Sequence, residues 1–353
     1  KLDMLGHDDP TMIKMLEDLT GVNARAIPLD DPDTMSIFTS SKVLGFENDE
    51  ILGPTGAVAI PEFNTRFTRG MLMDTMPKDF NTLVRLSGFS HGTDVWLGNA
   101  RELIVSGTAS VLETVGCRDD IMLYLISMGL DPKMSFKIME AVRKGKVKKS
   151  GFQEGWEEAM RDHEVPDWYI GSLAKIGYLF PKAHAVAYVM MAFRIAWFKV
   201  HEPLAFYATF FSIRAKAFDA EYCCAGLDAV KQKIKEIENN KDATDVEQNL
   251  MVTLEVCYEF YLRGFHFDTI DIYKSDATRF KITENGLLPP FVTVRGLGET
   301  AALDTVEKRK GKTFISVEEF ANTCSKLSKT HIEQLKALGA FAGMADTSQV
   351  SLF

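Results

Sequence analysis

Residues 180–201, with the sequence FPKAHAVAYVMMAFRIAWFKVH, are almost entirely apolar and yet carry several basic side chains. The basic residues are Lys182, His184, Arg194, Lys199 and His201. A bilayer crossing requires about 18 to 20 uninterrupted apolar residues, and Arg194 breaks this run. We therefore predict a helix packed in the interior of a helical domain, with no membrane as partner. A membrane-associated helical protein is the alternative, and it would depend on detergent for solubility.

The chain has 353 residues, of which 46% are hydrophobic and 25% charged, a typical globular composition that predicts about two domains. The cysteines show no CxxC spacing and we recognise no signal peptide, so we expect reduced thiols in a cytosol, without disulfides or zinc. The net charge of −9 does not exclude nucleic acid, because binding depends on where positive charge is concentrated. Since the first residue is Lys1, we expect a piece of a longer protein.

Apolar residues recur at helix-like spacings of three and four over most of the chain. A strand is predicted at residues 1–5, and Asp9 followed by Pro10 indicates a helix that runs to about Leu19. From there to about residue 265 the pattern remains helical. We therefore predict a mainly α fold.

Smaller elements are predicted in the rest of the chain. The sequence Glu-Asn-Gly at 284–286 separates two short extended runs and predicts a hairpin. Short helices follow, one of them with Ser328 as N-cap and Gly339 as C-cap. Residues 343–353 show no periodicity and are expected to form a mobile tail.

The start of the apolar helix is a candidate phosphate site. Pro181 suits the first helical turn, so Lys182 and His184 would lie beside free N–H groups, where the helix dipole favours anions. Tyr188 falls on the same face as His184, and Lys199 returns to roughly that face about 22 Å along the helix from His184. Such a stripe would suit a nucleotide followed by a nucleic-acid backbone. Alternatively, His184 and Tyr188 are hydrogen-bonded core residues and Lys199 extends its ammonium to solvent.

A second basic cluster lies in the segment MEAVRKGKVKK. It contains Arg143, Lys144, Lys146, Lys148 and Lys149, expected at a helix end and in the loop after it. Gly145 interrupts the run and would let the backbone approach a triphosphate or DNA closely. A solvated basic helix end, which complements the helix dipole, fits the same spacing.

A loop with turn character occupies residues 87–99, SGFSHGTDVWLGN. Polar residues, among them His91, lie between Phe89 and Trp96. The loop would either shape a binding pocket or only connect helices, and the spacing leaves both open.

The turn Gly296-Leu297-Gly298 leads into a helix-forming run. It would present backbone N–H groups to a phosphate without reading a base, although such turns also occur without a ligand. Together with the helical unit at 328–340, it would suit sequence-independent duplex binding. The terminal sequence QVSLF places a hydrophobic pair after a polar tail, which indicates either a docking peptide or a frayed terminus.

Together these stretches resemble the C-family replicative polymerases, in particular the alpha subunit of bacterial DNA polymerase III of the PolC type. The similar blocks, in the same order, are KLDMLGHDDPT, SGFSHGTDVWLGNA, FKIMEAVRKGK, FPKAHAVAYV, RGFHFDTIDIYKSDA, LLPPFVTVRGLGE and QVSLF. They extend over essentially the whole chain. The resemblance implies the C-terminal part of such an enzyme, in a bacterial cytoplasm. The implied divisions are the end of the palm at 1–8, fingers at 9–272, a duplex-binding domain with tandem helix-hairpin-helix elements at 273–345, and a clamp-binding tail at 346–353.

The resemblance implies one catalytic residue, Asp3, as a metal-binding carboxylate of the palm. Polymerases hold two Mg²⁺ ions about 3.5 to 4 Å apart, which activate the primer 3′-hydroxyl and stabilise the departing pyrophosphate. The two partner aspartates would lie upstream of Lys1. One carboxylate cannot hold the pair of ions, so we expect this chain alone to be inactive.

A site for the incoming deoxynucleoside triphosphate is implied in the fingers. Arg143, Lys144 and Lys146 would neutralise the triphosphate, and Lys182 and His184 would assist at the helix N-terminus. Tyr188 would pack beside the base or sugar. His91 and Arg118 would line the same cavity. None of these roles follows from the spacing alone.

Contacts to primer-template DNA and to a sliding clamp are also implied. The DNA-binding residues would be Gly296, Leu297 and Gly298 of the first hairpin, Lys199, and Arg66 and Arg69. The tail resembles the clamp peptide Q-L-S-L-F, with Val350 in place of the Leu. The clamp-binding residues would be Gln349, Val350, Ser351, Leu352 and Phe353.

The expected function is therefore part of a replicative DNA-directed DNA polymerase, which also associates with other replisome subunits. In this reading the chain supplies nucleotide-binding fingers, a grip on the duplex and a clamp tether for template-directed deoxynucleotidyl transfer. The alternative is a non-catalytic DNA-binding and clamp-docking scaffold of the same fold. An Asp-x-Asp pair encoded upstream of Lys1 would favour the polymerase. A start codon just before Lys1 would favour the scaffold.

Overall fold

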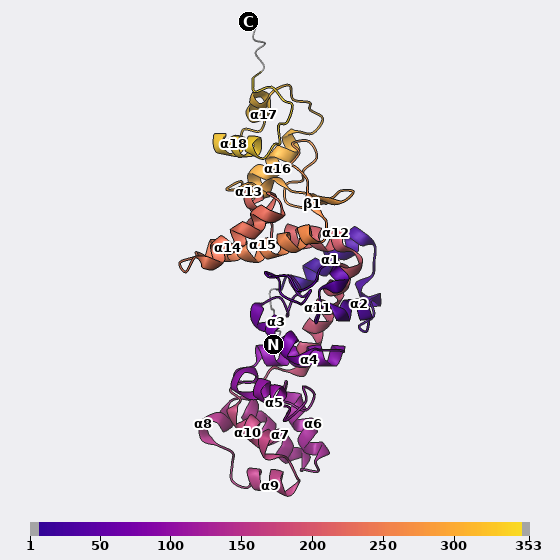
Figure 1. Cartoon of the computed structure of the whole chain (residues 1–353), viewed down its shortest axis with the longest axis vertical. Coiled ribbons are helices and arrows are strands. Elements are labelled where there is room, and N and C mark those ends of the chain that lie inside the picture. The colour runs from indigo at the N-terminus through magenta and orange to yellow at the C-terminus, as the bar shows by residue number, and fades with distance from the viewer. Residues whose placement is uncertain (1–6, 348–353) are drawn as a thin grey trace. The chain divides into compact units, whose positions relative to one another are not determined.

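The computed structural model describes residues 7–347, and the protein is mainly α-helical over this range, as predicted (Figure 1). The helices form two compact units. Within the described residues, unit 1 contains 7–25, 44–53 and 198–347, and unit 2 contains 26–43 and 54–197. The division falls inside one long helix, α11 (Lys182–His201), between Trp197 and Phe198.

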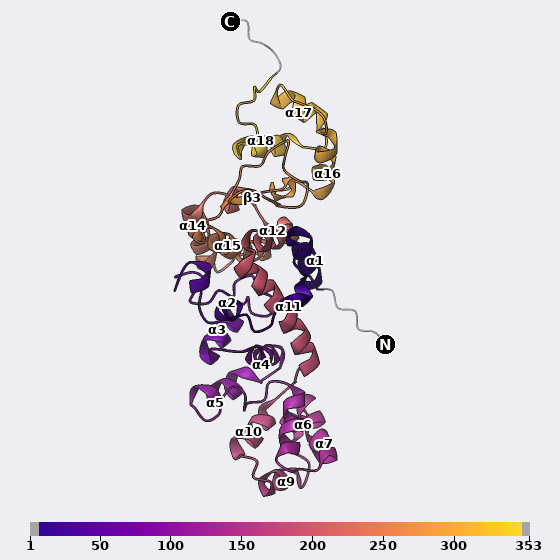
Figure 2. The same ribbon diagram turned by 90° about the vertical axis from the view of Figure 1, so that its right-hand side faces the viewer.

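Unit 2 is built from short helices. They are α2 (Pro32–Ser36), α3 (Arg66–Thr75), α4 (Phe80–His91), the π-helical turn η3 (Trp96–Ala100), α5 (Arg101–Val105), α6 (Arg118–Ser127), α7 (Pro132–Arg143), α8 (Lys146–Ser150), α9 (Trp156–Asp162), α10 (Asp167–Lys175) and the first part of α11. The side chains of Asp31, Thr65, Asp79 and Asp131 start helices by accepting a hydrogen bond from the N–H three residues later. Helices α6 and α7 lie side by side and bury apolar residues such as Leu125 (Figure 2).

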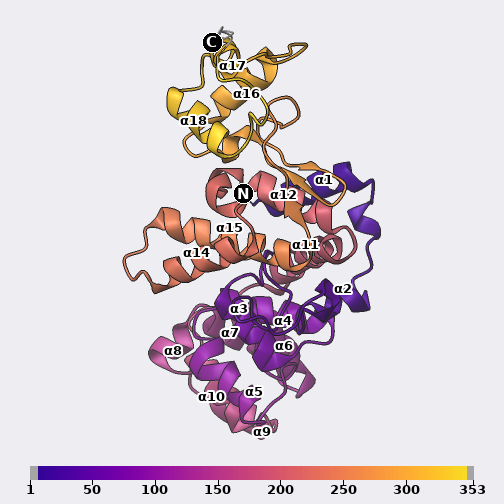
Figure 3. The same ribbon diagram turned by 45° about the horizontal axis from the view of Figure 1, so that its top comes forward.

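Unit 1 contains the remaining elements. They are α1 (Asp9–Thr20), α12 (Pro203–Ile213), η4 (Ala215–Ala217), α13 (Ala220–Cys223), α14 (Leu227–Asn239), α15 (Asp245–Leu262), β1 (His266–Phe267), β2 (Lys281–Ile282), β3 (Gly286–Leu288), η5 (Phe291–Thr293), α16 (Glu299–Lys308), α17 (Val317–Thr323) and α18 (Lys329–Ala337); η1 (Ala24–Ala26) and η2 (Lys42–Leu44) lie where the chain changes units. Helices α14 and α15 form a hairpin (Figure 3). Buried rings from α12, α15 and the region of the strands pack together and form an aromatic core in unit 1. They include Phe211, Phe260 and Phe280, the residue before β2.

The hairpin predicted at 284–286 is present. Strands β2 and β3 are antiparallel, and the Thr283 N–H donates to the Gly286 carbonyl at 3.0 Å. Strand β1 adds in parallel on the other edge of β3 and was not predicted, because two residues carry too little alternation to be noticed. Gly286 is required there, since a Cβ would lie 2.3 Å from the His266 carbonyl oxygen.

The predicted first helix is confirmed as α1, but its cap differs from the prediction. Asp9 is the first helical residue, and the N-cap is Asp8, whose side chain makes no capping hydrogen bond. Gly21 ends the helix with a φ of 73° and donates its N–H to Glu17. The strand predicted at 1–5 lies outside the described residues.

Helix α11 is long and apolar enough to cross a membrane by length and composition, with 44% of its apolar window buried inside the protein. The core helix of a soluble protein passes the same test, so this feature is weak evidence for a span. Its buried residues include Ala185, Val189 and Phe193 on one face. All five cysteines are free.

Candidate functional site

Segments that are far apart in the sequence meet in unit 2 at residues 176–181, which join α10 to α11 and are called the connector below. The predicted loop 87–99 is largely helical, because 87–91 end α4 and 96–99 belong to η3, and only 92–95 link the two. This link pairs with the connector through an antiparallel bridge between Thr93 and Tyr178. The Thr93 N–H donates to the Tyr178 carbonyl at 2.9 Å, and the Gly177 N–H donates to the Thr93 carbonyl at 2.9 Å. The connector therefore fixes the link that follows His91, which is the last residue of α4 and not a loop residue as predicted.

Two helix ends are held by the same connector. The Leu179 N–H donates to the carbonyl of Arg143, the last residue of α7, at 3.3 Å. The Arg118 N–H, at the first residue of α6, donates to the Phe180 carbonyl at 3.2 Å. Backbone hydrogen bonds thus bring Arg143 and Arg118 to one place from segments that are not adjacent in sequence.

Gly145 serves this packing, which differs from the predicted role beside a polyanion. It has a φ of 66°, and a Cβ there would lie 2.4 Å from the carbonyl oxygen of Gly177 in the connector. Only glycine allows this approach. The residues after it form the short helix α8, where a loop was predicted.

Arg143 and Lys144 share one carboxylate. Glu140, one turn earlier on α7, accepts hydrogen bonds from the Arg143 guanidinium, with Nη2 at 3.0 Å from Oε2, and lies 2.8 Å from the Lys144 ammonium. The hydrogen bond from Arg143, and then that from Lys144, lowers the pKa of Glu140 to about 2. Both predicted triphosphate ligands are therefore oriented, and partly neutralised, by an acid of the same helix.

The lysines of α8 differ in their partners. The Lys148 ammonium lies 2.6 Å from the Asp94 carboxylate, in the link between α4 and η3. Lys146 and Lys149 are exposed, and no carboxylate within residues 7–347 pairs with either of them. They leave positive charge on this surface that the chain itself does not neutralise.

The N-terminus of α11 already holds a carboxylate of the chain. The Lys182 N–H donates to Asp119 Oδ2 at 2.9 Å, so the predicted anion position beside Lys182 is filled by an internal anion. The Lys182 ammonium lies 3.4 Å from Asp120, whose carboxylate also binds Arg85. Arg118 lies at the same corner, 4.0 Å from Asp119.

His91 is held against the connector by an acid that the sequence analysis missed. Its Nε2 lies 2.6 Å from Oε2 of Glu62, and its ring stacks on Phe180 with centroids 4.8 Å apart. The hydrogen bond that His91 donates to Glu62 raises the pKa of His91. His184 lies against the same Phe180 ring, with centroids 6.0 Å apart, so the two histidines share one aromatic neighbour.

Glu62 has an unusual backbone. Its φ is 68°, in the left-handed region, although its side chain is only 6% exposed and also accepts a hydrogen bond from Ser87 at 3.0 Å. The sequence did contain a signal for Glu62, since it is the single acid inside the apolar run 57–63. A charge buried in such a run needs a partner, which here is His91.

Lys199 does not lie on a DNA-facing surface. Its side chain is fully buried, and its ammonium lies 2.7 Å from Oε1 of Glu259, which is also fully buried. The predicted DNA contact of Lys199 is therefore wrong, because burial leaves no route to a phosphate. The predicted stripe from His184 to Lys199 ends within the core, and Tyr188 between them is half-buried.

The other predicted residues fall into separate groups. On α3, Arg66 is exposed, whereas the Arg69 side chain is only 8% exposed, so only Arg66 is open to template or primer. Asp3 and the tail 349–353 lie outside the described residues. Among residues 7–347 no group of three or more His, Cys, Asp or Glu side chains is arranged to hold a metal ion.

The turn at 296–298 has the geometry of a tight hairpin in unit 1. Gly296 has a φ of 76°, and Gly298 is the N-cap residue of α16. The Leu297 side chain is 3% exposed and anchors the turn, so the DNA contact predicted there would have to come from the backbone. The helical element predicted at 328–340 begins as predicted. The Ser328 side chain accepts a hydrogen bond from the His331 N–H and caps α18.

Comparisons with known proteins match two regions of the chain to families and the whole chain to individual relatives. The family described as the bacterial DNA polymerase III alpha subunit finger domain matches residues 9–164, and the helix-hairpin-helix motif matches residues 264–350. A protein of Caldanaerobacter subterraneus subsp. tengcongensis, named DNA polymerase III PolC-type, is 54% identical over the whole of this chain. The chain belongs to the PolC-type DNA polymerase III family. PolC-type relatives from Halalkalibacterium halodurans and Streptococcus mutans are 51% and 50% identical, again over the whole chain.

The chain spans about a quarter of the length of these PolC-type relatives, 25% of the first and 24% of the other two. The finger-domain match includes His91, Arg118 and Arg143 but ends at residue 164, before the connector. The connector and α11 lie between the two matched ranges. Membership of the PolC-type family thus rests on the whole chain, whereas the site is assembled partly from residues outside both matched domains.

Proposed function

We propose that this chain is the part of a replicative DNA-directed DNA polymerase that binds the incoming deoxynucleoside triphosphate and grips the primer-template duplex. The observation that carries the proposal is that basic residues from different segments lie next to the connector. Backbone hydrogen bonds join Arg118 and Arg143 to it, and Lys182 follows it directly as the first residue of α11. The high identity to PolC-type polymerases supports the same assignment.

The triphosphate would bind by exchange with internal carboxylates. Arg143 and Lys144 are already oriented by Glu140, so a phosphate group that displaces this acid gains charge-assisted hydrogen bonds without ordering flexible side chains. Lys146 is exposed and would meet the phosphates first. His184 and Tyr188 follow on α11, where the base or sugar would lie, with His91 and Arg118 at the edge of the site.

Duplex binding is assigned to the helix-hairpin-helix region. The backbone of 296–298 would contact phosphates of either strand without reading bases, and Arg66 would contact template or primer. The proposed divisions remain palm end 1–8, fingers 9–272, duplex-binding domain 273–345 and tail 346–353. We further propose that Gln349, Val350, Ser351, Leu352 and Phe353 dock on a sliding clamp. The protein would also associate with other replisome subunits and would be located in the bacterial cytoplasm.

Catalysis would require residues beyond this chain. Asp3 is proposed as one carboxylate ligand of two Mg²⁺ ions, which in polymerases activate the primer 3′-hydroxyl and stabilise the leaving pyrophosphate. Since no metal-binding group of three or more side chains exists among residues 7–347, the described part of this chain would hold substrates and leave metal chemistry to the palm.

The test measures duplex binding and primer extension by the purified 353-residue chain in parallel, with Mg²⁺ and deoxynucleotides. We expect binding without extension, with an affinity that falls steeply with salt and does not depend on sequence. Extension would mean that the metal site lies entirely within these residues. A strong sequence preference, or no duplex binding, would contradict the proposed grip. The alternative of a non-catalytic scaffold would be favoured if the complete protein bound duplex and clamp but never extended a primer.

A further inference from the structure

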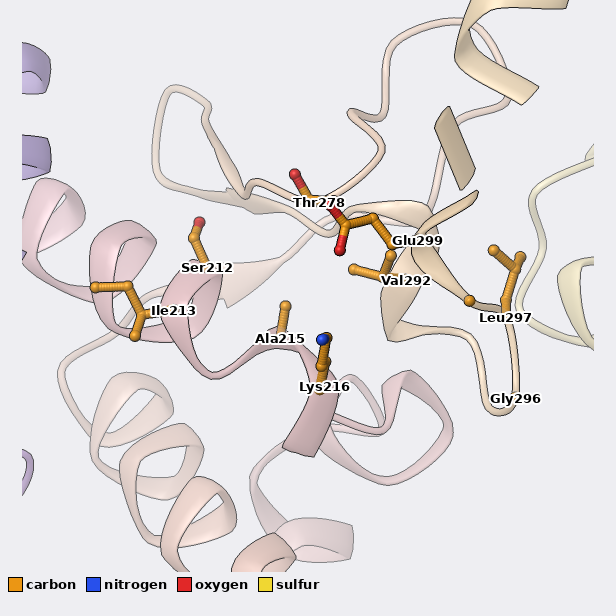
Figure 4. A pocket seen from close by; sticks show the side chains of 10 residues that line it. Ser212, Ile213, Ala215, Lys216, Thr278, Val292, Gly296, Leu297 and Glu299 are labelled. Atoms are coloured by element: carbon orange, nitrogen blue, oxygen red, sulfur yellow. The ribbon is translucent and has the colours of Figure 1, made fainter. Parts of the chain in front are cut away.

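A cavity of about 510 Å³ lies beside the hairpin turn in unit 1 (Figure 4). Gly296, Leu297 and Gly298 form one wall. The opposite wall is the connection from α12 to η4, including Lys216, and Thr278 lies between them. The cavity is therefore continuous with the hairpin but reaches a segment far from it in sequence.

Hydrogen bonds fix the walls relative to one another. The Phe280 N–H donates to Ser212 Oγ at 2.9 Å, which ties the chain after Thr278 to the end of α12. The Val292 N–H donates to the Ala277 carbonyl at 3.1 Å, which ties the segment before the hairpin to the same chain. The opening is thus built by packed elements of one unit and not by a loose loop.

One cation lines this opening, and two more are direct chain neighbours of residues that line it. Lys216 is in the wall, Arg214 lies between wall residues of the same connection, and Arg279 follows the wall residue Thr278. All three are exposed, and none is paired with a carboxylate within residues 7–347. The Arg214 guanidinium lies 5.9 Å from the centroid of the Phe210 ring, which orients it without neutralising it.

Two acids lie near these cations. Glu299 belongs to the wall at the start of α16 and faces the cavity from the side opposite Lys216 (Figure 4). The Asp276 carboxylate accepts hydrogen bonds from the backbone N–H groups of Thr278 and Arg279 and forms no ion pair with the three cations. Positive charge therefore exceeds negative charge around the opening.

We propose that this cavity, with Lys216 in its wall and Arg214 and Arg279 next to wall residues in the chain, forms a second contact for the sugar-phosphate backbone of duplex DNA. The inference rests on the proposed duplex grip and extends it, because Arg214 and Lys216 lie before residue 264, where the helix-hairpin-helix match begins. Duplex DNA is the occupant that fits, since its dense phosphate charge would cover both the hairpin backbone and the cations next to it. A small anion would reach only one of these groups.

The test measures binding of a labelled duplex to the 353-residue chain over a series of salt concentrations. Each lost phosphate contact flattens the plot of log K against log salt by about 0.9. We expect Lys216→Ala to flatten it by about that amount, and Lys216→Ala with Arg279→Ala by about twice as much. The loss of affinity is expected to be equal for duplexes of unrelated sequence.

Lys241→Ala is the matched control, because it removes the same charge from an exposed position between α14 and α15, away from the cavity. It should leave the slope unchanged. If all variants flatten the slope equally, the effect is general charge and the inference is wrong. If the parent chain binds duplex and Lys216→Ala binds with the same slope, the inference fails while the proposed grip stands. If the parent chain does not bind duplex, both fail. Unchanged thermal melts would show that the variants fold.

Discussion

Lys199 and Glu259 form an ion pair inside unit 1 in which both side chains are fully buried and Nζ lies 2.7 Å from Oε1. The Tyr207 hydroxyl donates to the same oxygen at 2.7 Å, and burial raises the pKa of Tyr207 well above its usual value. Arg263 joins the group by donating to the Lys199 carbonyl at 2.9 Å. This network connects the last turn of α11 to α12 and α15, so its role is internal.

Lys199→Met is expected to lower the free energy of unfolding by about 3 to 5 kcal/mol, because Glu259 is left as an uncompensated buried charge. Urea denaturation measures this loss. The double variant Lys199→Met with Glu259→Leu should lose much less than the sum of the single variants, since no charge remains buried. Lys241→Met serves as an exposed control. A cost for Lys199→Met no larger than that of the control would show that the pair does not stabilise the fold.

Gly145→Ala is expected to destabilise unit 2 by more than its left-handed backbone alone requires. A methyl group would meet the Gly177 carbonyl at 2.4 Å, so the connector and the end of α7 must separate. Gly98→Ala is the matched control, because Gly98 has nearly the same φ of 72° but nothing within 4 Å of its Cβ position. We expect about 1 kcal/mol for the control and clearly more for Gly145→Ala in urea denaturation. Equal losses would mean that the close approach costs nothing.

The His91–Glu62 pair predicts a pH dependence of stability. The hydrogen bond that His91 donates to Glu62 raises the folded-state pKa of His91 above its unfolded value of about 6.5. The protonated form is therefore favoured in the folded state, so the stabilisation is complete below about pH 6.5 and is lost as pH rises through the folded pKa. Glu62→Gln should remove this dependence and lower the pKa of His91 measured by NMR. His184→Gln is a control near the same ring, and a His91 pKa unchanged by Glu62→Gln would refute the coupling.

Arg143→Ala in the complete polymerase is expected to raise the KM for deoxynucleotides about tenfold or more, because one charge-assisted hydrogen bond to phosphate is lost. Duplex affinity should change little. Lys137→Ala, an exposed cation on the same helix, is the control. Steady-state kinetics and a separate duplex-binding measurement distinguish the two effects, and equal losses in both would argue against a triphosphate role.

Deletion of residues 349–353 is expected to leave extension of short primers unchanged and to shorten products made with the clamp present. The physical reason is that a tethered polymerase rebinds the same primer at a high effective concentration. Product length on a long template, with and without clamp, measures this. Products of unchanged length would refute the tether.

Helical periodicity and turn chemistry predicted much of the fold. The Asp9-Pro10 start of α1, the turn at 284–286 and the Ser328 cap are local signals that the surrounding packing does not oppose. Strand β1 has only two residues, so it acquires its identity from β3 and not from its own sequence.

The site was only partly predictable, because charge partners are set by tertiary contacts. The sequence identified Arg143, Lys182 and His91 as cations but not the acids that hold them. Lys199 has the same helical phase as His184, yet Glu259 from α15 turns it into a core residue. The pattern of a single sequence does not reveal that Lys199 will meet a carboxylate of a later helix.

The carboxylate of Asp119 at the first N–H of α11 has a consequence for anion selectivity. Any incoming anion must displace a ligand that the chain supplies at very high local concentration. A singly charged ion such as chloride or acetate gains nothing by this exchange, whereas a polyphosphate gains further contacts with neighbouring cations. If a polyphosphate binds at this helix end as proposed, we expect competition with Asp119 to select it over singly charged ions.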